Sequence, residues 1–138
     1  MKKTVVGLTG QSGAGKTTIS DAFRENGFEI INCDIVAREV TQAGNECCKE
    51  LAKIFPDCFD ENYSLDRRKL GEIVFSDKNK LQMLNDTIYP FINKLIDEKI
   101  NATESRFILL DAPTLFEAGA DKLCSVIVSV VADYDIRL

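Results

Sequence analysis

The amino-acid sequence predicts an α/β fold, in which a parallel β-sheet is flanked by helices and carries a helical insertion between its second and third strands. Three observations predict it. Short runs rich in Val, Ile and Leu recur near both ends of the chain, a glycine-rich loop joins the first run to a helix, and a long stretch of helical spacing follows the second run. The 138 residues, 45% of them hydrophobic, suit one domain with an ordinary core.

The first elements form a strand–helix–strand unit. Residues 4–9 form a short β-rich run bounded by glycine, which predicts a buried strand. Residues 16–26 predict a helix that ends at Gly27, and residues 28–32 predict the second strand. A strand, a helix and a strand in so few residues indicate a parallel pair.

The insertion, residues 34–104, has mostly helical spacing. Four helices are expected, over residues 34–40, 45–55, 66–75 and 77–101. Asp34 is a candidate cap for the first of them. We also expect a loop over residues 57–64 and a break at Tyr89-Pro90, because proline removes a backbone donor. An insertion of this length is long for a simple crossover, and we expect it to cover the carboxyl edge of the sheet, where open α/β folds bind ligands.

Strands resume after the insertion, at residues 106–110 and 125–130. Both are rich in Ile, Val and Leu, as parallel strands covered on two faces should be. The domain prediction is therefore a single domain over residues 1–138, with a core of residues 1–33 and 105–138 around the insertion. A further helix is expected to begin at Asp133, and since Leu138 follows within about one turn we expect the chain to represent part of a longer protein.

The loop after the first strand has the phosphate-binding pattern G-x-x-x-x-G-K-[ST]. It is spelled Gly10-Gln11-Ser12-Gly13-Ala14-Gly15-Lys16-Thr17, and Thr18 follows. The glycines let several backbone N–H groups point inward at an anion, and the next helix directs its positive end at the same place. Lys16 would reach the β- and γ-phosphates of ATP, and the Thr17 hydroxyl would ligate Mg²⁺. The sequence thus predicts a P-loop NTPase-like fold that binds ATP and Mg²⁺.

Two aspartates at strand ends are candidate catalytic and metal-binding groups. Asp34 follows the second strand, where a carboxylate can take the proton of an acceptor hydroxyl; the alternative is a helix cap. Asp111 ends an apolar run, where the metal-binding aspartate of P-loop proteins lies; the alternative is a turn before Pro113. Arg38, four residues after Asp34, either holds an acceptor phosphate or pairs with Asp34.

Other motifs are weaker. The sequence has no D-x-x-G element, and residues 93–97 place the aspartate of a GTPase-type N-K-x-D element one residue late, in a helical pattern. The charged run at residues 66–69 is either a solvated helix start or a clamp for substrate. The missing D-x-x-G element and the displaced aspartate at residues 93–97 disfavour a GTPase.

Net charge and cysteine content indicate which partners, metal sites and cellular location to expect. The formal charge of −5 argues against a nucleic-acid or membrane surface as partner, because both usually select a basic face. Five cysteines without CxxC spacing, and no histidine, favour reduced thiols over disulfides or a zinc site. No apolar run reaches the length of a membrane span, so we expect a cytoplasmic protein.

Four segments in order resemble the dephospho-coenzyme A kinase family. They are residues 8–18, residues 32–40 with their aspartate-x-x-x-arginine pattern, residues 65–75 and residues 111–117. The resemblance implies a cytoplasmic transferase that moves the γ-phosphate of ATP to the ribose 3′-hydroxyl of dephospho-coenzyme A, the last step of coenzyme A biosynthesis. It also implies a P-loop kinase sheet, a helical acceptor-binding region and a mobile lid.

The resemblance also assigns roles to residues. Asp34 aligns with the base, and Arg38 helps to place the acceptor. The second catalytic candidate, Lys16, comes from the phosphate-loop pattern itself. Phe116 and Glu117 lie in the segment beside the acceptor site. Oligomeric state is left open.

Two departures from the family pattern matter. Tyr89 precedes the proline where the family usually has histidine, and family members are longer, so the C-terminal lid and last strand are expected to be absent here. Two alternatives to the family function stay open. One is a P-loop kinase for another nucleotide or small metabolite, and the other is a catalytically weak ATP-binding fragment.

Overall fold

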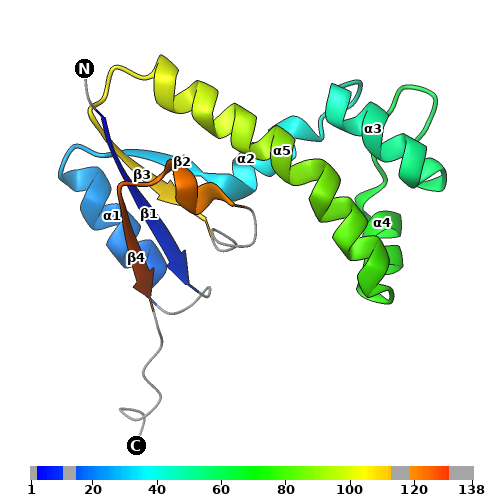
Figure 1. Ribbon diagram of the computed structural model, residues 1–138, viewed down its shortest axis with the longest axis horizontal. Coiled ribbons are helices and arrows are strands. Elements are labelled where there is room, and N and C mark those ends of the chain that lie inside the picture. The colour runs from blue at the N-terminus through cyan, green and yellow to red at the C-terminus, as the bar shows by residue number, and fades with distance from the viewer. Residues whose placement is uncertain (1–2, 11–14, 113–118, 131–138) are drawn as a thin grey trace, which may run out of the picture. The chain divides into compact units, whose positions relative to one another are not determined.

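The computed structural model describes residues 3–10, 15–112 and 119–130 (Figure 1). The chain divides into two compact units, Met1–Asp34 with Ile96–Leu138, and Ile35–Leu95. The first unit contains the sheet and the second is helical. The helix expected to begin at Asp133 lies outside the described residues.

Four parallel strands form the sheet, in the order β2-β3-β1-β4. They are β1 (Thr4–Gly10), β2 (Glu29–Asn32), β3 (Phe107–Asp111) and β4 (Val126–Val130). The sequence predicts all four to within one residue at each end, and their parallel direction is confirmed. Since the strands are parallel, their carboxyl ends meet at one edge of the sheet.

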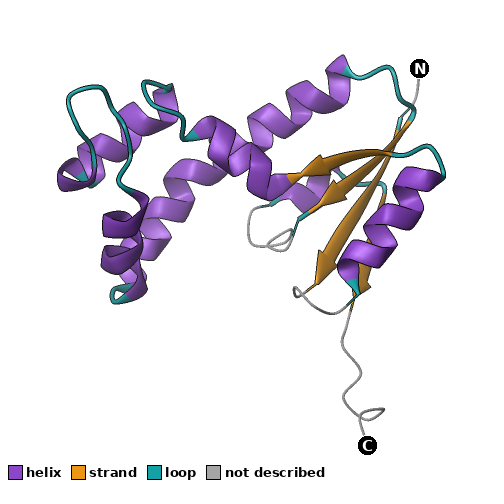
Figure 2. Ribbon diagram, turned by 180° about the vertical axis from the view of Figure 1, so that it is seen from behind, coloured by secondary structure: helices purple, strands orange, loops and turns teal. Residues whose placement is uncertain are grey.

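Helix α1 (Lys16–Glu25) covers one face of this sheet (Figure 2). Ile19 and Phe23 of α1 pack against a buried cluster of Val6, Leu8 and Leu109. Leu8 and Leu109 have no exposed surface, and burying such a side chain contributes about 1.5–3 kcal/mol. The apolar spacing of α1 therefore fixes which side of the helix faces the sheet.

The helical unit is built around α3 (Glu46–Ile54), the short 3₁₀ helix η1 (Pro56–Cys58) and α4 (Arg67–Phe75). Helices α2 (Cys33–Val40) and α5 (Lys78–Ala102) have residues in both units, and the 3₁₀ helix η2 (Ala120–Leu123) precedes β4. Asp66 caps α4, because its carboxylate accepts the Lys69 N–H at 3.1 Å. The four helices expected in the insertion are thus present, each within one residue of the predicted bounds.

Helix α5 runs through Pro90 without interruption, so the predicted break at Tyr89-Pro90 is wrong. A proline inside a helix costs about 3 kcal/mol, because it removes one hydrogen bond and crowds the preceding turn. Beyond it, Ile92, Ile96 and Ile100 recur every four residues and are at most 8% exposed. Burial of three such side chains contributes about 1.5–3 kcal/mol each, which exceeds the cost of the proline.

The segment expected as a loop over residues 57–64 is more ordered than predicted. Its start belongs to η1, and Phe59 forms an isolated antiparallel bridge with Leu65. The Asp60 carboxylate accepts the backbone N–H groups of Asn62 and Ser64, each at 2.9 Å. An aspartate that accepts hydrogen bonds from backbone N–H groups two and four residues ahead stabilises a turn. The spacing of apolar residues in the sequence does not reveal such a turn.

All five cysteines are free thiols, and three of them, Cys47, Cys48 and Cys58, lie in the core of the helical unit. Burial, followed by the neighbouring Cys48, raises the pKa of Cys47 from an ordinary 9.0 to about 11. Since Cys47 is 1% exposed, the folded protein keeps this thiol protonated where the unfolded chain would release the proton.

We therefore expect the protein to lose stability between about pH 9 and pH 11, because the unfolded state binds fewer protons there. The contribution of Cys47 approaches 2–3 kcal/mol, at about 1.36 kcal/mol per pKa unit. Chemical denaturation of the wild type and of Cys47→Ala across this range measures it. The free energy of unfolding should fall less steeply with pH in the variant than in the wild type. Parallel plots of this free energy against pH would contradict the assignment to Cys47.

Candidate active site

The first candidate element is the start of helix α1. Gly15 is its N-cap residue with φ 91° and ψ 9°, a left-handed conformation that favours glycine, and Gly10 at the end of β1 has φ 139°. Within the described residues no side chain caps the start of this helix, and its first turn contains no acidic residue. The positive end of the helix is therefore suited to an anion.

Part of the predicted phosphate loop lies outside the described residues. This applies to Gln11, Ser12, Gly13 and Ala14, and to the side chain of Lys16. The backbone places Lys16, Thr17 and Thr18 in the first turn of α1, and the side chains of Thr17 and Thr18 are exposed. The predicted strand before the pattern and the predicted helix after it are confirmed.

Asp111 is the last residue of β3 and lies at the carboxyl edge of the sheet. Its register partners are Leu8 on β1 and Asn32 on β2. Side chains alternate along a strand, so Asp111 shares a face with Leu109, which packs in the cluster beneath α1. The carboxylate of Asp111 thus lies on the side of the sheet that α1 covers, at the same edge as the start of α1. Asp111 ends the strand as predicted, and the alternative of a turn before Pro113 stays open, because residues 113–118 lie outside the described residues.

Asp34 lies in the first turn of α2, so the alternative that it is the N-cap is wrong. Helix α2 begins at Cys33, one residue after the end of β2, so the capping position falls on Asn32. The Asn32 Oδ1 atom accepts the N–H of Asp34 at 2.9 Å. Asparagine and aspartate are equally good caps, and the residue just before the helix takes the role. The side chain of Asp34 is exposed and accessible to a substrate.

Asn32 is the residue that sequence reasoning missed. An asparagine directly before a helix is a capping signal, but Asp34 carries the same signal, and the choice depends on where the helix begins. The absence of any loop between β2 and α2 decides it.

Arg38 lies four residues after Asp34 in α2, and both side chains are exposed. This spacing places them on one face of the helix. Both roles predicted for Arg38, holding an acceptor phosphate and pairing with Asp34, therefore remain predictions. Phe116 and Glu117 lie outside the described residues.

Two weaker motifs have structural explanations. In the run at residues 66–69, Asp66 caps α4, the Arg67 guanidinium donates to the Thr41 hydroxyl at 2.8 Å, and Arg68 lies 3.6 Å from Glu72. These contacts favour the helix-start interpretation over a substrate clamp. Residues 93–97 lie inside α5, as their helical spacing predicts.

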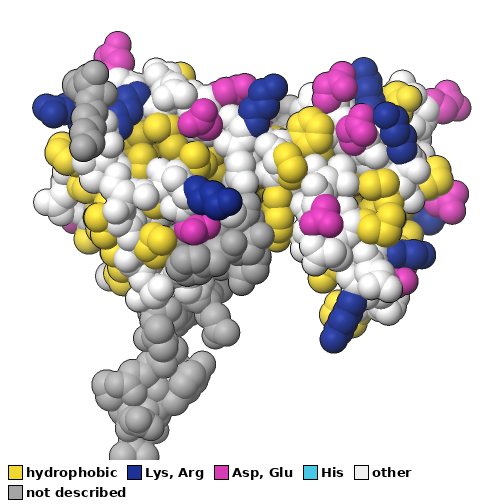
Figure 3. Space-filling model, viewed as in Figure 1, with side chains coloured by type: hydrophobic (Ala, Val, Ile, Leu, Met, Phe, Trp, Pro, Cys, Tyr) yellow, Lys and Arg dark blue, Asp and Glu magenta, His cyan; other side chains and the backbone are white. Residues whose placement is uncertain are grey.

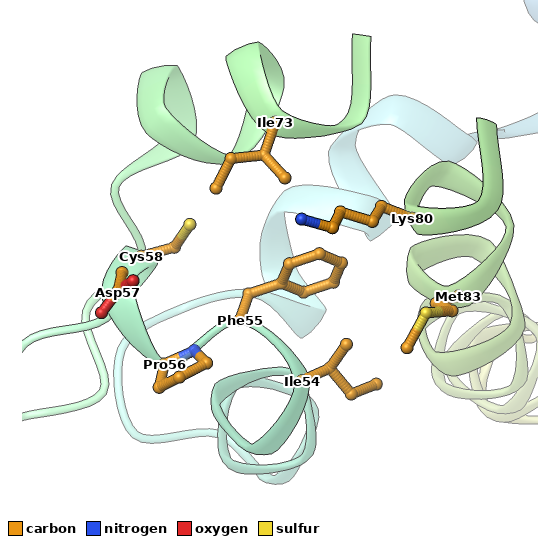
Figure 4. Close-up of a pocket in the computed structure, with 8 residues that line it drawn as sticks. All are labelled: Ile54, Phe55, Pro56, Asp57, Cys58, Ile73, Lys80 and Met83. Atoms are coloured by element: carbon orange, nitrogen blue, oxygen red, sulfur yellow. The ribbon is translucent and has the colours of Figure 1, made fainter. Parts of the chain in front are cut away.

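Two of the hollows in the described part of the helical unit contain neither Asp34 nor Arg38. The first is a mostly apolar cavity of about 140 Å³ into which Lys80 extends (Figure 4). It is smaller than the roughly 300–1,000 Å³ of typical ligand pockets. The second, about 330 Å³, is lined by three aspartates, Asp57, Asp60 and Asp66, whose charge disfavours a phosphate-bearing ligand.

Charges on the surface are mixed. Lys and Arg side chains are interspersed with Asp and Glu on the face shown in Figure 3. Among the described residues, no helix has the length and apolar character needed to cross a membrane.

The sheet order, the glycine-initiated helix and the strand-end aspartate define the chain as a P-loop kinase fold. A family model described as dephospho-CoA kinase matches residues 4–138. The dephospho-CoA kinase of Fusobacterium nucleatum subsp. nucleatum is 34% identical over 138 residues, which is all of this chain and 72% of that protein. The chain belongs to the dephospho-CoA kinase family.

A further relative agrees with this assignment, and a solved structure shares the fold. The dephospho-CoA kinase of Bacillus licheniformis is 34% identical over 139 residues, covering 97% of this chain and 69% of that protein. A solved structure from Thermus thermophilus superposes with a TM-score of 0.79 and 29% identity, over 99% of this chain and 70% of that chain. The chain therefore spans about 70% of the length of these relatives.

Proposed function

We propose that this dephospho-CoA kinase phosphorylates the ribose 3′-hydroxyl of dephospho-coenzyme A, with ATP as donor and Mg²⁺ as cofactor. The strand register is the observation that supports the proposal most directly. It brings Asp111 and the end of β2 to the edge of the sheet at which α1 begins. Donor phosphates, metal-binding oxygens and a base can therefore meet at one edge.

The donor side is formed by the loop at residues 10–18. Backbone N–H groups and the start of α1 bind the phosphates, and Lys16 neutralises charge on the β- and γ-phosphates. A protein side chain that capped the start of α1 would compete with an anion, and none among the described residues does so.

The oxygens of Thr17 and Asp111 suit Mg²⁺, which prefers hard oxygen ligands. Thr17 is exposed in the first turn of α1, and Asp111 ends β3 on the same side of the sheet. Bound Mg²⁺ would neutralise charge on the transferred phosphate. These two residues are the ones proposed to hold it.

The acceptor side depends on Asp34 and Arg38. The ribose 3′-oxygen attacks the γ-phosphorus, the bond from that phosphorus to the β–γ bridging oxygen breaks, and ADP leaves. The hydroxyl proton passes to the Asp34 carboxylate, which is exposed in the first turn of α2. Arg38, one turn later, binds a phosphate of the acceptor. Phe116 and Glu117 are further residues proposed to bind the acceptor. The acceptor-binding role of the insertion, residues 34–104, is part of this proposal and rests on its first helix, through Asp34 and Arg38.

A steady-state assay of the purified protein with Mg·ATP tests the substrate. We expect turnover with dephospho-coenzyme A, and little or none with adenosine monophosphate or shikimate as acceptor. Dephospho-coenzyme A should also protect the protein from proteolysis, while the other two compounds should not. Good turnover with either of them, and none with dephospho-coenzyme A, would favour the alternative of another small-metabolite kinase.

A further inference from the structure

We infer that Asn32 is a positioning residue for the base Asp34. The inference rests on the proposed function, because Asn32 would act on the reaction only through Asp34. The contact that supports it is the hydrogen bond from the Asp34 N–H to Asn32 Oδ1, at 2.9 Å. Only the oxygen of an asparagine amide can accept from an N–H, so this contact also fixes the orientation of the amide.

The position of Asn32 makes this contact rigid. Asn32 is the last residue of β2 and pairs in register with Asp111 of β3. Its side chain is half-buried, whereas the side chain of Asp34 is exposed. Asp34 therefore depends on its backbone for its position, and Asn32 connects that backbone to the sheet.

The junction between β2 and α2 gives this bond more influence than an ordinary cap has. The strand ends at Asn32 and the helix begins at Cys33, so no loop absorbs a change in direction. Without the amide oxygen, the first turn of α2 loses a bond that fixes its start at the sheet edge. Asp34 lies in that turn, and a misplacement of about 1 Å in a reacting group can lower a rate by about 10²-fold.

The same kind of cap occurs elsewhere and provides a matched control. Asp77 directly precedes α5, and its carboxylate accepts a hydrogen bond from the Asn79 N–H at 3.0 Å. As with Asn32 and Asp34, the donor is two residues after the acceptor. Asp77→Ala removes an equivalent cap without touching the proposed site. A general loss of stability would therefore affect Asp77→Ala and Asn32→Ala alike, whereas an effect on the base would affect only Asn32→Ala.

The first measurement is the steady-state kinetics of Asn32→Ala, Asn32→Ser and Asp77→Ala with Mg·ATP and dephospho-coenzyme A. We expect Asn32→Ala to lower kcat by about 10–100-fold, with KM for ATP within about twofold of the wild type. Serine also caps helices, so Asn32→Ser should recover most of the rate. Asp77→Ala should lower the melting temperature but change kcat by less than about twofold. If Asn32→Ala does not fold, Asn32→Gly removes the oxygen at a position where glycine is tolerated.

The second measurement is a double-mutant cycle with Asp34→Asn. If Asn32 acts through Asp34, Asn32→Ala should reduce kcat by less than about twofold once Asp34 is already asparagine. An unchanged kcat in Asn32→Ala, or an equal reduction in both backgrounds, would overturn the inference and leave the role of Asp34 intact. If Asp34→Asn itself keeps the wild-type rate, that result contradicts both the role of Asp34 as the base and this inference.

Discussion

Replacing Asp34 with asparagine should lower kcat by about 10²–10⁴-fold, the usual contribution of a general base. Asparagine has nearly the same shape but cannot take the proton of the acceptor hydroxyl. Because Asp34 lies in α2 and not in the phosphate loop, the Kd for Mg·ATP should stay within about twofold of the wild type. Single-turnover kinetics measures the chemical step, and equilibrium titration with ATP measures binding.

Asp97→Asn is the matched control for this variant. Asp97 is also an exposed aspartate on a helix, and it lies in α5. Its replacement should leave both the rate and ATP binding unchanged. A wild-type rate in Asp34→Asn would remove Asp34 as the base, and an equal loss of ATP binding and rate would point to a role in holding the nucleotide.

Replacing Lys16 with methionine should weaken ATP binding and lower kcat by about 10²–10³-fold. Methionine keeps the unbranched stem and removes the charge that would bind the β- and γ-phosphates. Unlike Asp34→Asn, this variant should raise KM for ATP as well as slow the chemical step. Steady-state kinetics at varied ATP concentration separates the two effects.

The control for Lys16→Met is Lys94→Met, which removes an exposed lysine of α5. It should bind ATP and turn over as the wild type does. If Lys16→Met retained the wild-type KM for ATP and the wild-type kcat, the phosphate loop would not be the donor site. If Lys94→Met lost activity to the same degree, a general effect of charge removal would explain both results.

Most of the sheet is predictable from the sequence because buried parallel strands leave short, continuous apolar runs. The strands at Thr4–Gly10 and Phe107–Asp111 are of this kind. The phosphate loop is predictable because glycine spacing directly specifies a backbone shape. The sequence alone does not show that β3 lies between β1 and β2, which is what brings Asp111 beside Leu8 and Asn32.

Two errors show where local reasoning fails. The break at Pro90 was expected from the missing donor alone, but the outcome depends on the burial of Ile92, Ile96 and Ile100 beyond it. Asp34 was a candidate cap of α2, although the strand before it ends so late that Asn32 takes this position. In both cases a tertiary constraint outweighs a local preference.

The position of the new phosphate in the product is the most direct test of the proposed reaction. The protein is incubated with Mg·ATP and dephospho-coenzyme A, and the product is analysed by ³¹P NMR and mass spectrometry. We expect one phosphate to be added, as a monoester on the ribose 3′-oxygen, with one ADP formed for each product. Phosphate on another hydroxyl, or ADP formed with inorganic phosphate and no modified acceptor, would contradict the account.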